Sequence, residues 1–341
     1  MPGKKNNTEY SQVELLHKQH FGCKPMNIEP LTSHGSDRTI LRLHIHGSTS
    51  IGIINEHLQE NRSFIAFGNH FRKSGINVPE IFTVSNDNYS YLMEDLGDTT
   101  LLREIQKRGD SPFGDKEIDL YKKVIEILPE FQVRAGKTID FSFCYQFSEF
   151  AEENIRFDLD YFYNRFLLNF YKGTIDNNLL HKDINELISH LIKADRNHFL
   201  YRDFQSRNIM LKNGNFYFID FQSGRRGALL YDLASLLYDA KACIPQDTRE
   251  KLVDHYFEVV KNHTQIDTVQ YQEYFWYFAV VRILQAMGAY GFLGIVKGKS
   301  RFLESIPLAL TNMNFILNNR IQKNSLKYLR TIFSEIKYEK T

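Results

Sequence analysis

The sequence contains few cysteines. Its three, Cys23, Cys144 and Cys243, lie far apart, form no Cys-x-x-Cys pair and leave an odd thiol. We therefore expect neither a disulfide framework nor a zinc site, and a reducing compartment fits best. The polar first ten residues also lack the apolar core of a secretory signal, so the predicted location is cytoplasmic.

The sequence also lacks a charge excess and a charge-free apolar span. Lys and Arg number 42 against 41 Asp and Glu, which leaves a net charge of +1. The most apolar stretch, 275–296, carries Arg282, Gln285 and three glycines, so it predicts a buried helix rather than a membrane span. We expect no nucleic acid and no membrane as a partner, and no obligate protein partner is evident.

The composition is that of a globular protein. Hydrophobic residues make up 43% of the chain and aromatic residues 14%. A length of 341 residues exceeds one typical domain and predicts two domains, or one large unit with two lobes.

Residues 1–97 predict a small antiparallel sheet. A short helix is expected at 10–22 and a second one at 63–74, which Gly75 would end. Alternating apolar residues predict strands at 29–31, 39–43, 50–54, 78–84 and 89–94. The polar turn Ser33-His34-Gly35-Ser36 follows the first strand, and turns of this kind bind phosphate.

Residues 98–341 predict a mainly helical second domain. One helix has its apolar residues between Ile118 and Leu128, and Pro129 is expected to interrupt it. The exceptions are two strands at 209–211 and 216–221, which the Asn213-Gly214 turn would join as a hairpin.

A group of polar residues surrounds this hairpin. Asp203 is followed after four residues by Asn208, and eleven residues later by Asp220. Phosphoryl transfer needs a carboxylate beside the attacking hydroxyl and oxygen ligands for magnesium, and these residue types supply both. Each residue alone has an ordinary role in a loop or turn. Their combined spacing favours the catalytic interpretation.

These segments resemble the catalytic and metal-binding loops of the aminoglycoside phosphotransferase and choline kinase-like family. The resemblance lies in 201–210, 219–222 and 226–237, and it extends through 35–43, 64–98 and 280–291. Within the family, it is closest to the cell-wall amino-sugar kinases, which phosphorylate the anomeric hydroxyl of N-acetylmuramate and N-acetylglucosamine. The implied fold is α+β: a bilobal protein-kinase-like fold with a small antiparallel-sheet N-lobe (1–97) and a larger, mainly helical C-lobe (98–341).

The resemblance also implies roles for single residues. Asp203 matches the catalytic base, and Asn208 and Asp220 match the magnesium ligands. The run Leu92–Leu96 matches the inter-lobe hinge strand whose backbone meets adenine. We call this run the hinge segment. The expected cofactors are ATP and Mg²⁺. The expected cofactor-binding residues are Ser33, Gly35, Ser36, Arg38, Glu94 and Leu96.

The sequence departs from the family pattern at two places. Tyr201 stands where the family usually has a histidine, a change compatible with a scaffolding role. The third strand, 50–55, lacks the lysine that kinases direct at the phosphates, so an inactive kinase is one interpretation. Arg38 and Arg42 share one face of the preceding strand, and Arg38 is the better candidate to replace the lysine.

Three further charged residues allow more than one interpretation. Asp232 begins an apolar run, where an acid suits the start of a helix. Arg225 and Arg226 follow the metal loop and either bind an anionic group of the substrate or pair with acids.

The acceptor is the least determined part of the prediction. From residue 273 onward, the sequence contains ten Lys or Arg and four acidic residues. This excess of positive charge disfavours a polycationic aminoglycoside and suits an acceptor with a carboxylate. A solvated helical face explains the same excess. We expect a small-molecule sugar as substrate, with a kinase of another alcohol or aminoglycoside, or a non-catalytic nucleotide-binding module, as the alternatives.

Overall fold

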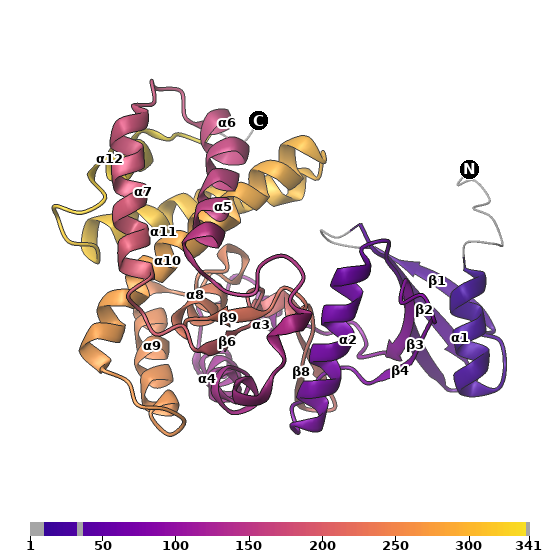
Figure 1. Ribbon diagram of the computed structural model, residues 1–341. Coiled ribbons are helices and arrows are strands. Elements are labelled where there is room, and N and C mark those ends of the chain that lie inside the picture. The colour runs from indigo at the N-terminus through magenta and orange to yellow at the C-terminus, as the bar shows by residue number, and fades with distance from the viewer. Residues whose placement is uncertain (1–9, 33–36, 339–341) are drawn as a thin grey trace. The chain divides into compact units, whose positions relative to one another are not determined.

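A computed structural model describes residues 10–32 and 37–338 (Figure 1). The expected phosphate-binding residues Ser33, Gly35 and Ser36 lie outside the described residues.

The chain divides into two compact units, which we describe separately. Unit 1 comprises Met1–Thr100, Ile139–Gln146 and Asn208–Ser223, and unit 2 comprises Leu101–Thr138, Phe147–Arg207 and Gly224–Thr341. Unit 1 thus takes in two segments from beyond residue 97, one of which contains the expected metal ligands. The domain limits 1–97 and 98–341 stay a prediction.

Unit 1 contains a five-stranded antiparallel sheet. Its strands are β1 (Asn27–Leu31), β2 (Thr39–Ile45), β3 (Ser48–Ile54), β4 (Ile81–Val84) and β5 (Ser90–Glu94). Their order in the sheet is β1-β2-β3-β5-β4. The five strands predicted for this region are therefore confirmed.

Two helices cover opposite faces of this sheet (Figure 1). Because side chains of a strand alternate between faces, Leu41 and Leu43 of β2 point to one face and are fully buried. There they meet Val13 and Leu16 of α1 (Ser11–Phe21). Arg42 lies between the two leucines and belongs to the other face.

The second helix, α2 (Leu58–Lys73), buries Phe64, Phe67 and Phe71. It begins five residues before the predicted start, because the Asn55 side chain accepts a hydrogen bond from the His57 amide and turns the chain into the helix. Gly75 follows its end at φ +77°, the left-handed conformation expected of a terminating glycine.

The predicted hairpin is also present in unit 1. It consists of β7 (Ile209–Lys212) and β8 (Asn215–Phe218). Asn213 and Gly214 both have positive φ, 52° and 76°, as a two-residue type I′ turn requires. The prediction that the second strand reaches Phe221 is wrong, since Asp220 takes φ +65° and cannot continue a strand.

Unit 2 is mainly helical, as predicted. Its α-helices are α3 (Leu101–Gln106), α4 (Asp115–Pro129), α5 (Glu152–Phe162), α6 (Leu168–Phe170), α7 (Asn177–Leu191), α8 (Leu230–Leu237), α9 (Gln246–Val260), α10 (Thr268–Gly291), α11 (Ile306–Asn319) and α12 (Lys327–Glu335). It also contains a strand pair that the sequence analysis missed, β6 (His198–Leu200) with β9 (Arg225–Gly227). Three residues are too few to show an alternating pattern.

Pro129 ends the α-helix, as predicted, but helical backbone of another kind follows it. It is the last residue of α4, and the chain continues as a π-helix, Glu130–Ala135. Two further π-helical segments, Tyr163–Leu167 and Phe292–Val296, follow α5 and α10.

The apolar stretch 275–296 lies mostly in α10. The segment Thr268–Val296 is long and apolar enough to cross a membrane, yet 56% of its most apolar window is buried inside the protein. Arg282 is also buried, and its Nε donates to Ser235 Oγ at 2.9 Å. These contacts make α10 a core helix of unit 2, as predicted.

Candidate active site

The open end of the β7–β8 hairpin brings two of the predicted site residues together. Asn208 precedes β7 and Asp220 follows β8, and the Ile219 amide donates to the Asn208 carbonyl at 3.0 Å. Asn208 is buried, whereas the Asp220 side chain is 37% exposed. An amide and a carboxylate are thereby held at one end of a short, rigid ladder.

This donor set suits magnesium that is shared with a nucleotide. Among residues 10–32 and 37–338, no three His, Cys, Asp or Glu side chains gather as a metal site. One amide oxygen and one carboxylate suffice for magnesium, since this ion keeps waters and takes further ligands from phosphates. The residues present therefore fit a nucleotide-bound Mg²⁺.

Aromatic stacking fixes the segment that carries Asp220. Phe221 is fully buried and stacks on Phe64 of α2, with ring centroids 4.7 Å apart and planes 5° from parallel. On β5, Tyr91 stacks on the same Phe64 at 5.4 Å. The packing supports the left-handed backbone of Asp220, a conformation that costs a non-glycine residue free energy.

Arg38 lies beside the proposed metal ligand. Its Nη2 donates to Asp220 Oδ1 at 2.9 Å, and its Nε is 3.9 Å from Glu60 Oε1. The Arg38 side chain is 10% exposed. Burial alone would lower the pKa of Arg38, but the charges of Asp220 and Glu60 and the hydrogen bond to Asp220 raise it above its ordinary value.

Glu60 is a part of this network that the sequence analysis missed. Its Oε2 accepts from Asn55 Nδ2 at 3.0 Å, and its Oε1 from Gln222 Nε2 at 3.3 Å. Asn55 is held in turn by Asn61, whose Oδ1 accepts from it at 3.1 Å. Glu60 thus has a fixed orientation toward Arg38. In the sequence, Glu60 could have been found only from its position in the helix and its spacing from Asn55.

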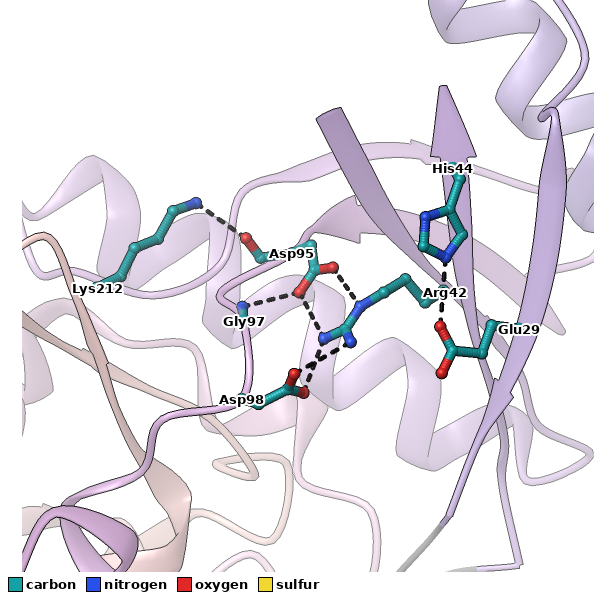
Figure 2. Close-up of polar contacts among 7 residues, drawn as sticks. All are labelled: Glu29, Arg42, His44, Asp95, Gly97, Asp98 and Lys212. Carbon is teal, nitrogen blue, oxygen red and sulfur yellow. Dashed lines mark hydrogen bonds and ion pairs between the residues drawn. The ribbon is translucent and has the colours of Figure 1, made fainter. Parts of the chain in front are cut away.

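Arg42 is bound elsewhere, and, contrary to the expectation, it does not share a strand with Arg38, because β2 begins at Thr39. Its guanidinium pairs with Asp95 and Asp98, at distances of 2.6 and 2.9 Å (Figure 2). Burial would raise the pKa of Asp95, but hydrogen bonds from Arg42, the Gly97 amide and Thr49 hold it below its usual value. Of the two arginines, Arg38 alone pairs with Asp220 in the described structure.

Several polar groups of the hinge segment are hydrogen-bonded within unit 1. Lys212 Nζ donates to Glu94 Oε1 at 2.8 Å and to the Asp95 carbonyl at 2.9 Å. The Glu94 amide donates to the Glu80 carbonyl. Among the described residues, none accepts a hydrogen bond from the amide of Leu96. That amide is a donor available to a ligand.

Asp203 belongs to unit 2, in the turn after β6. It is half-buried, and its carbonyl accepts from the Gln205 amide at 2.9 Å. The residue before it, Arg202, has φ +83°, which is unusual for any residue but glycine. The chain passes into unit 1 at Asn208, five residues later.

Asp232 holds this turn in place. Its carboxylate accepts from the amides of Tyr201 at 2.9 Å and Arg202 at 2.8 Å, and from Gln132 Nε2 at 2.9 Å. Burial raises the pKa of Asp232 to about 7, although these hydrogen bonds act in the opposite direction. Asp232 is therefore an anchor for the backbone before Asp203, a role more specific than the predicted helix start.

The Arg202 side chain secures the same turn from the other side. It is buried, its Nη2 donates to Asp158 Oδ1 at 2.6 Å, and its Nη1 donates to the Tyr231 hydroxyl at 2.7 Å. The buried ion pair and the Asp232 hydrogen bonds together explain how an arginine is held at positive φ.

Tyr201 and Arg225 also have structural surroundings. Tyr201 is buried between Phe131 and Phe204, with centroids 5.4 and 5.2 Å away, which supports the scaffolding interpretation. Arg225 is buried, and its Nη1 donates to Asn154 Oδ1 at 2.9 Å. Arg226 is exposed, so it is the better placed of the two to meet an anion from solution.

A family comparison agrees with this arrangement. Residues 27–266 match the model of the phosphotransferase enzyme family, about 70% of the chain. The chain belongs to this family. It is accordingly a small-molecule phosphotransferase, and the resemblance drawn from 201–222 is confirmed.

Individual relatives of this phosphotransferase have low sequence identity to it. The N-acetylmuramate/N-acetylglucosamine kinase of Neisseria meningitidis serogroup B is 25% identical over 239 residues, 68% of each chain. A Plasmodium vivax ethanolamine kinase superposes with a TM-score of 0.64 at 14% identity, over 94% of this chain and 93% of that one. An amicoumacin kinase in complex with AMP-PNP and Ca²⁺ gives 0.60 at 14% identity, over 94% and 98%.

The two solved structures establish the fold. At 14% identity they carry no substrate information, but their TM-scores and coverage show a protein-kinase-like architecture. The predicted class, an antiparallel sheet followed by a mainly helical region, is confirmed. The roles of Asp203, Asn208 and Asp220 stay predictions.

Proposed function

We propose that this phosphotransferase is an ATP-dependent sugar kinase. The transferred group is the γ-phosphoryl group, and the acceptor is the anomeric hydroxyl of an amino sugar such as N-acetylmuramate or N-acetylglucosamine. The observation that carries the proposal is that Asn208 and Asp220 lie at the open end of one hairpin, where the Ile219 amide bonds to the Asn208 carbonyl and Arg38 donates to Asp220.

In this proposal Asn208 and Asp220 hold the metal. When bound, Mg²⁺ neutralises charge on the β- and γ-phosphates and orients them. The protein contributes the oxygen ligands in a fixed position, because the Ile219 hydrogen bond and the Phe221 stack leave the two residues little freedom.

Asp203 is the proposed catalytic base. An aspartate, with an ordinary pKa of about 3.9, is a weak base, so its role is to orient the acceptor hydroxyl and to take the proton late in the transfer. That role requires the backbone around Asp203 to be held rigidly. The Asp232 hydrogen bonds to the amides of Tyr201 and Arg202 supply it.

Arg38 is the proposed substitute for the absent strand lysine. β3 contains no lysine, and Arg38 supplies a cation fixed between Asp220 and Glu60. An arginine also offers several donors in a fork that matches phosphate oxygens. The polar turn with Ser33, Gly35 and Ser36 directly precedes it in the sequence and is proposed to contact the same phosphates.

The hinge segment is the proposed adenine site. The Leu96 amide has no acceptor among the described residues, whereas the neighbouring Asp95 carbonyl and Gly97 amide are both bonded. The backbone of Glu94 and Leu96 would meet the base. ATP is therefore the proposed nucleotide and Mg²⁺ the proposed metal.

An amino-sugar acceptor is supported by the 25% identical relative and by the basic residues after position 273. The alternatives are a kinase for an amino alcohol or an antibiotic, which the structural neighbours represent, and a nucleotide-binding module without turnover. A cytoplasmic location without nucleic-acid, membrane or obligate protein partners completes the proposal.

One incubation tests the proposal. The chain is mixed with ATP, magnesium and separate acceptors, including both amino sugars, ethanolamine and an aminoglycoside, and products are followed by mass spectrometry and phosphorus NMR. A 1-phosphate formed from either amino sugar is the expected result. Phosphorylation of only ethanolamine or the antibiotic would refute the sugar assignment, and tight ATP binding without any product would favour the module.

A further inference from the structure

A guanidinium and two carboxylates enclose the end of the hinge segment. Arg42 Nε and Nη2 lie 2.6 and 3.2 Å from the Asp95 carboxylate, and Nη2 and Nη1 lie 2.9 and 3.3 Å from that of Asp98 (Figure 2). We name this group, Arg42 with Asp95 and Asp98, the Arg42 clamp. It joins the middle of β2 to residues more than fifty positions later in the chain.

The two halves of the clamp differ in strength. The side chains of Arg42 and Asp95 are 13% and 5% exposed, whereas that of Asp98 is 66% exposed. A buried, two-pronged arginine–carboxylate pair is strong and geometrically specific. An exposed pair contributes little by itself. The Asp95 half therefore determines the geometry, and the Asp98 half supports it.

The clamp fixes the backbone on both sides of Leu96. Asp95 Oδ1 accepts from the Gly97 amide at 2.8 Å as well as from Arg42, and Gly97 takes φ +79°. Lys212 Nζ occupies the Asp95 carbonyl. The polar groups next to Leu96 are thereby bonded within the protein, and the Leu96 amide is left as a donor in a set direction.

We propose that Arg42 is a positioning residue for the nucleobase: by holding Asp95, it presents the Leu96 amide as a fixed donor to a purine. A fixed donor requires an acceptor on the base. If the base meets this donor with N1, adenine offers an acceptor nitrogen there, whereas guanine carries a hydrogen, so the clamp favours adenine over guanine. The inference rests on the proposed function and adds to it a residue and a base preference.

Binding measurements on the full chain separate the two ends of the nucleotide. Isothermal titration with adenosine, guanosine, ATP and inorganic tripolyphosphate is compared for wild type, Arg42→Gln, Arg42→Lys and Asp98→Asn. The matched control is Glu29→Gln, which removes the carboxylate from the exposed 3.3 Å contact between Glu29 of β1 and His44 of β2 and leaves the hinge segment unchanged (Figure 2).

The expected pattern is specific to the base. Arg42→Gln weakens adenosine and ATP binding by about tenfold, the scale of one lost charge-assisted hydrogen bond, and leaves tripolyphosphate binding unchanged. Arg42→Lys falls in between, Asp98→Asn loses roughly two- to threefold, and Glu29→Gln matches wild type. Wild type binds guanosine more weakly than adenosine.

Opposite results are equally clear. Variants that bind adenosine as wild type does would overturn the inference while the proposed function stands, and so would a wild type that prefers guanosine. Equal losses for adenosine and tripolyphosphate would show a merely structural role for Arg42. If Arg42→Gln does not fold, Arg42→Lys and the exposed Asp98→Asn decide. A wild type that binds neither ATP nor adenosine would refute both proposals.

Discussion

The Arg38 guanidinium and the Asp220 carboxylate form an ion pair of 2.9 Å between residues 182 positions apart in the chain. An arginine keeps its charge at any physiological pH. The proposed metal ligand Asp220 therefore has a positively charged partner even when no metal is bound. The same cation stands 3.9 Å from Glu60. In the proposal, the positive charge that most kinases carry on the third strand comes instead from Arg38, the residue just before β2.

Arg38→Gln is expected to lower kcat/KM for ATP by at least about tenfold, because a forked cation at the phosphates is lost. Arg38→Lys keeps the charge without the fork and should fall between this variant and wild type. Steady-state kinetics with ATP varied at saturating acceptor measure the effect. Arg62→Gln, at an exposed position of α2, is the control. Wild-type kinetics for Arg38→Gln would remove Arg38 from the phosphate site.

Asp203→Asn is expected to lower kcat by roughly 10²- to 10⁴-fold, the usual effect of losing a general base. The KM for ATP should change little, since Asp203 faces the acceptor in the proposal. Coupled detection of ADP gives kcat, and thermal unfolding checks that the variant is folded. Full activity of a folded Asp203→Asn enzyme would contradict the base assignment.

Asp232 should make the free energy of unfolding depend on pH. Its folded pKa of about 7 lies above the unfolded value of about 3.9, so between these values the folded chain holds a proton that the unfolded chain has lost. Stability therefore falls as pH rises from about 4 to about 7. Asp232→Asn should lack this component. Urea unfolding of both proteins near pH 5 and pH 7.5 tests it, and parallel pH dependences would contradict the prediction.

Gly291→Ala should destabilise unit 2. A Cβ there would lie 2.7 Å from the Arg165 carbonyl carbon and collide with the carbonyl oxygen, so α10 would have to move away from the π-helix Tyr163–Leu167. The free energy of unfolding should fall by about 3 kcal/mol. At Gly114, a Cβ meets no atom closer than 3.6 Å, so Gly114→Ala should cost less than about 1 kcal/mol. Equal costs would show that the close approach does not matter.

The sequence was most informative where local chemistry decides the structure. Alternation predicted the five strands, and Asn213-Gly214 predicted the hairpin, because both depend on neighbouring residues alone. The segments around Asp203, Asn208 and Asp220 carried the resemblance to the family, which the family comparison confirms. In the structure, the Ile219 amide bonds to the Asn208 carbonyl, which places Asn208 and Asp220 at the same end of the hairpin.

The missed features depend on partners distant in the chain. The positions of Arg42 and Asp95 show no local pattern that links them, although a buried pair holds them together. Asp232 looks like an ordinary helix start until its contacts with residues 30 and 31 positions earlier are seen. Similarly, the π-helix after Pro129 has no pattern that separates it from an α-helix.

The stacked rings of Tyr91, Phe64 and Phe221 have a consequence for how a nucleotide would be measured. They connect β5, which carries the start of the hinge segment, through α2 to the residue next to Asp220. The stacked rings would accordingly hold a fixed distance between the proposed positions of the base and of the terminal phosphate. A nucleotide with a shorter phosphate chain would occupy only one of these two positions. Selection by phosphate-chain length would then require no conformational change.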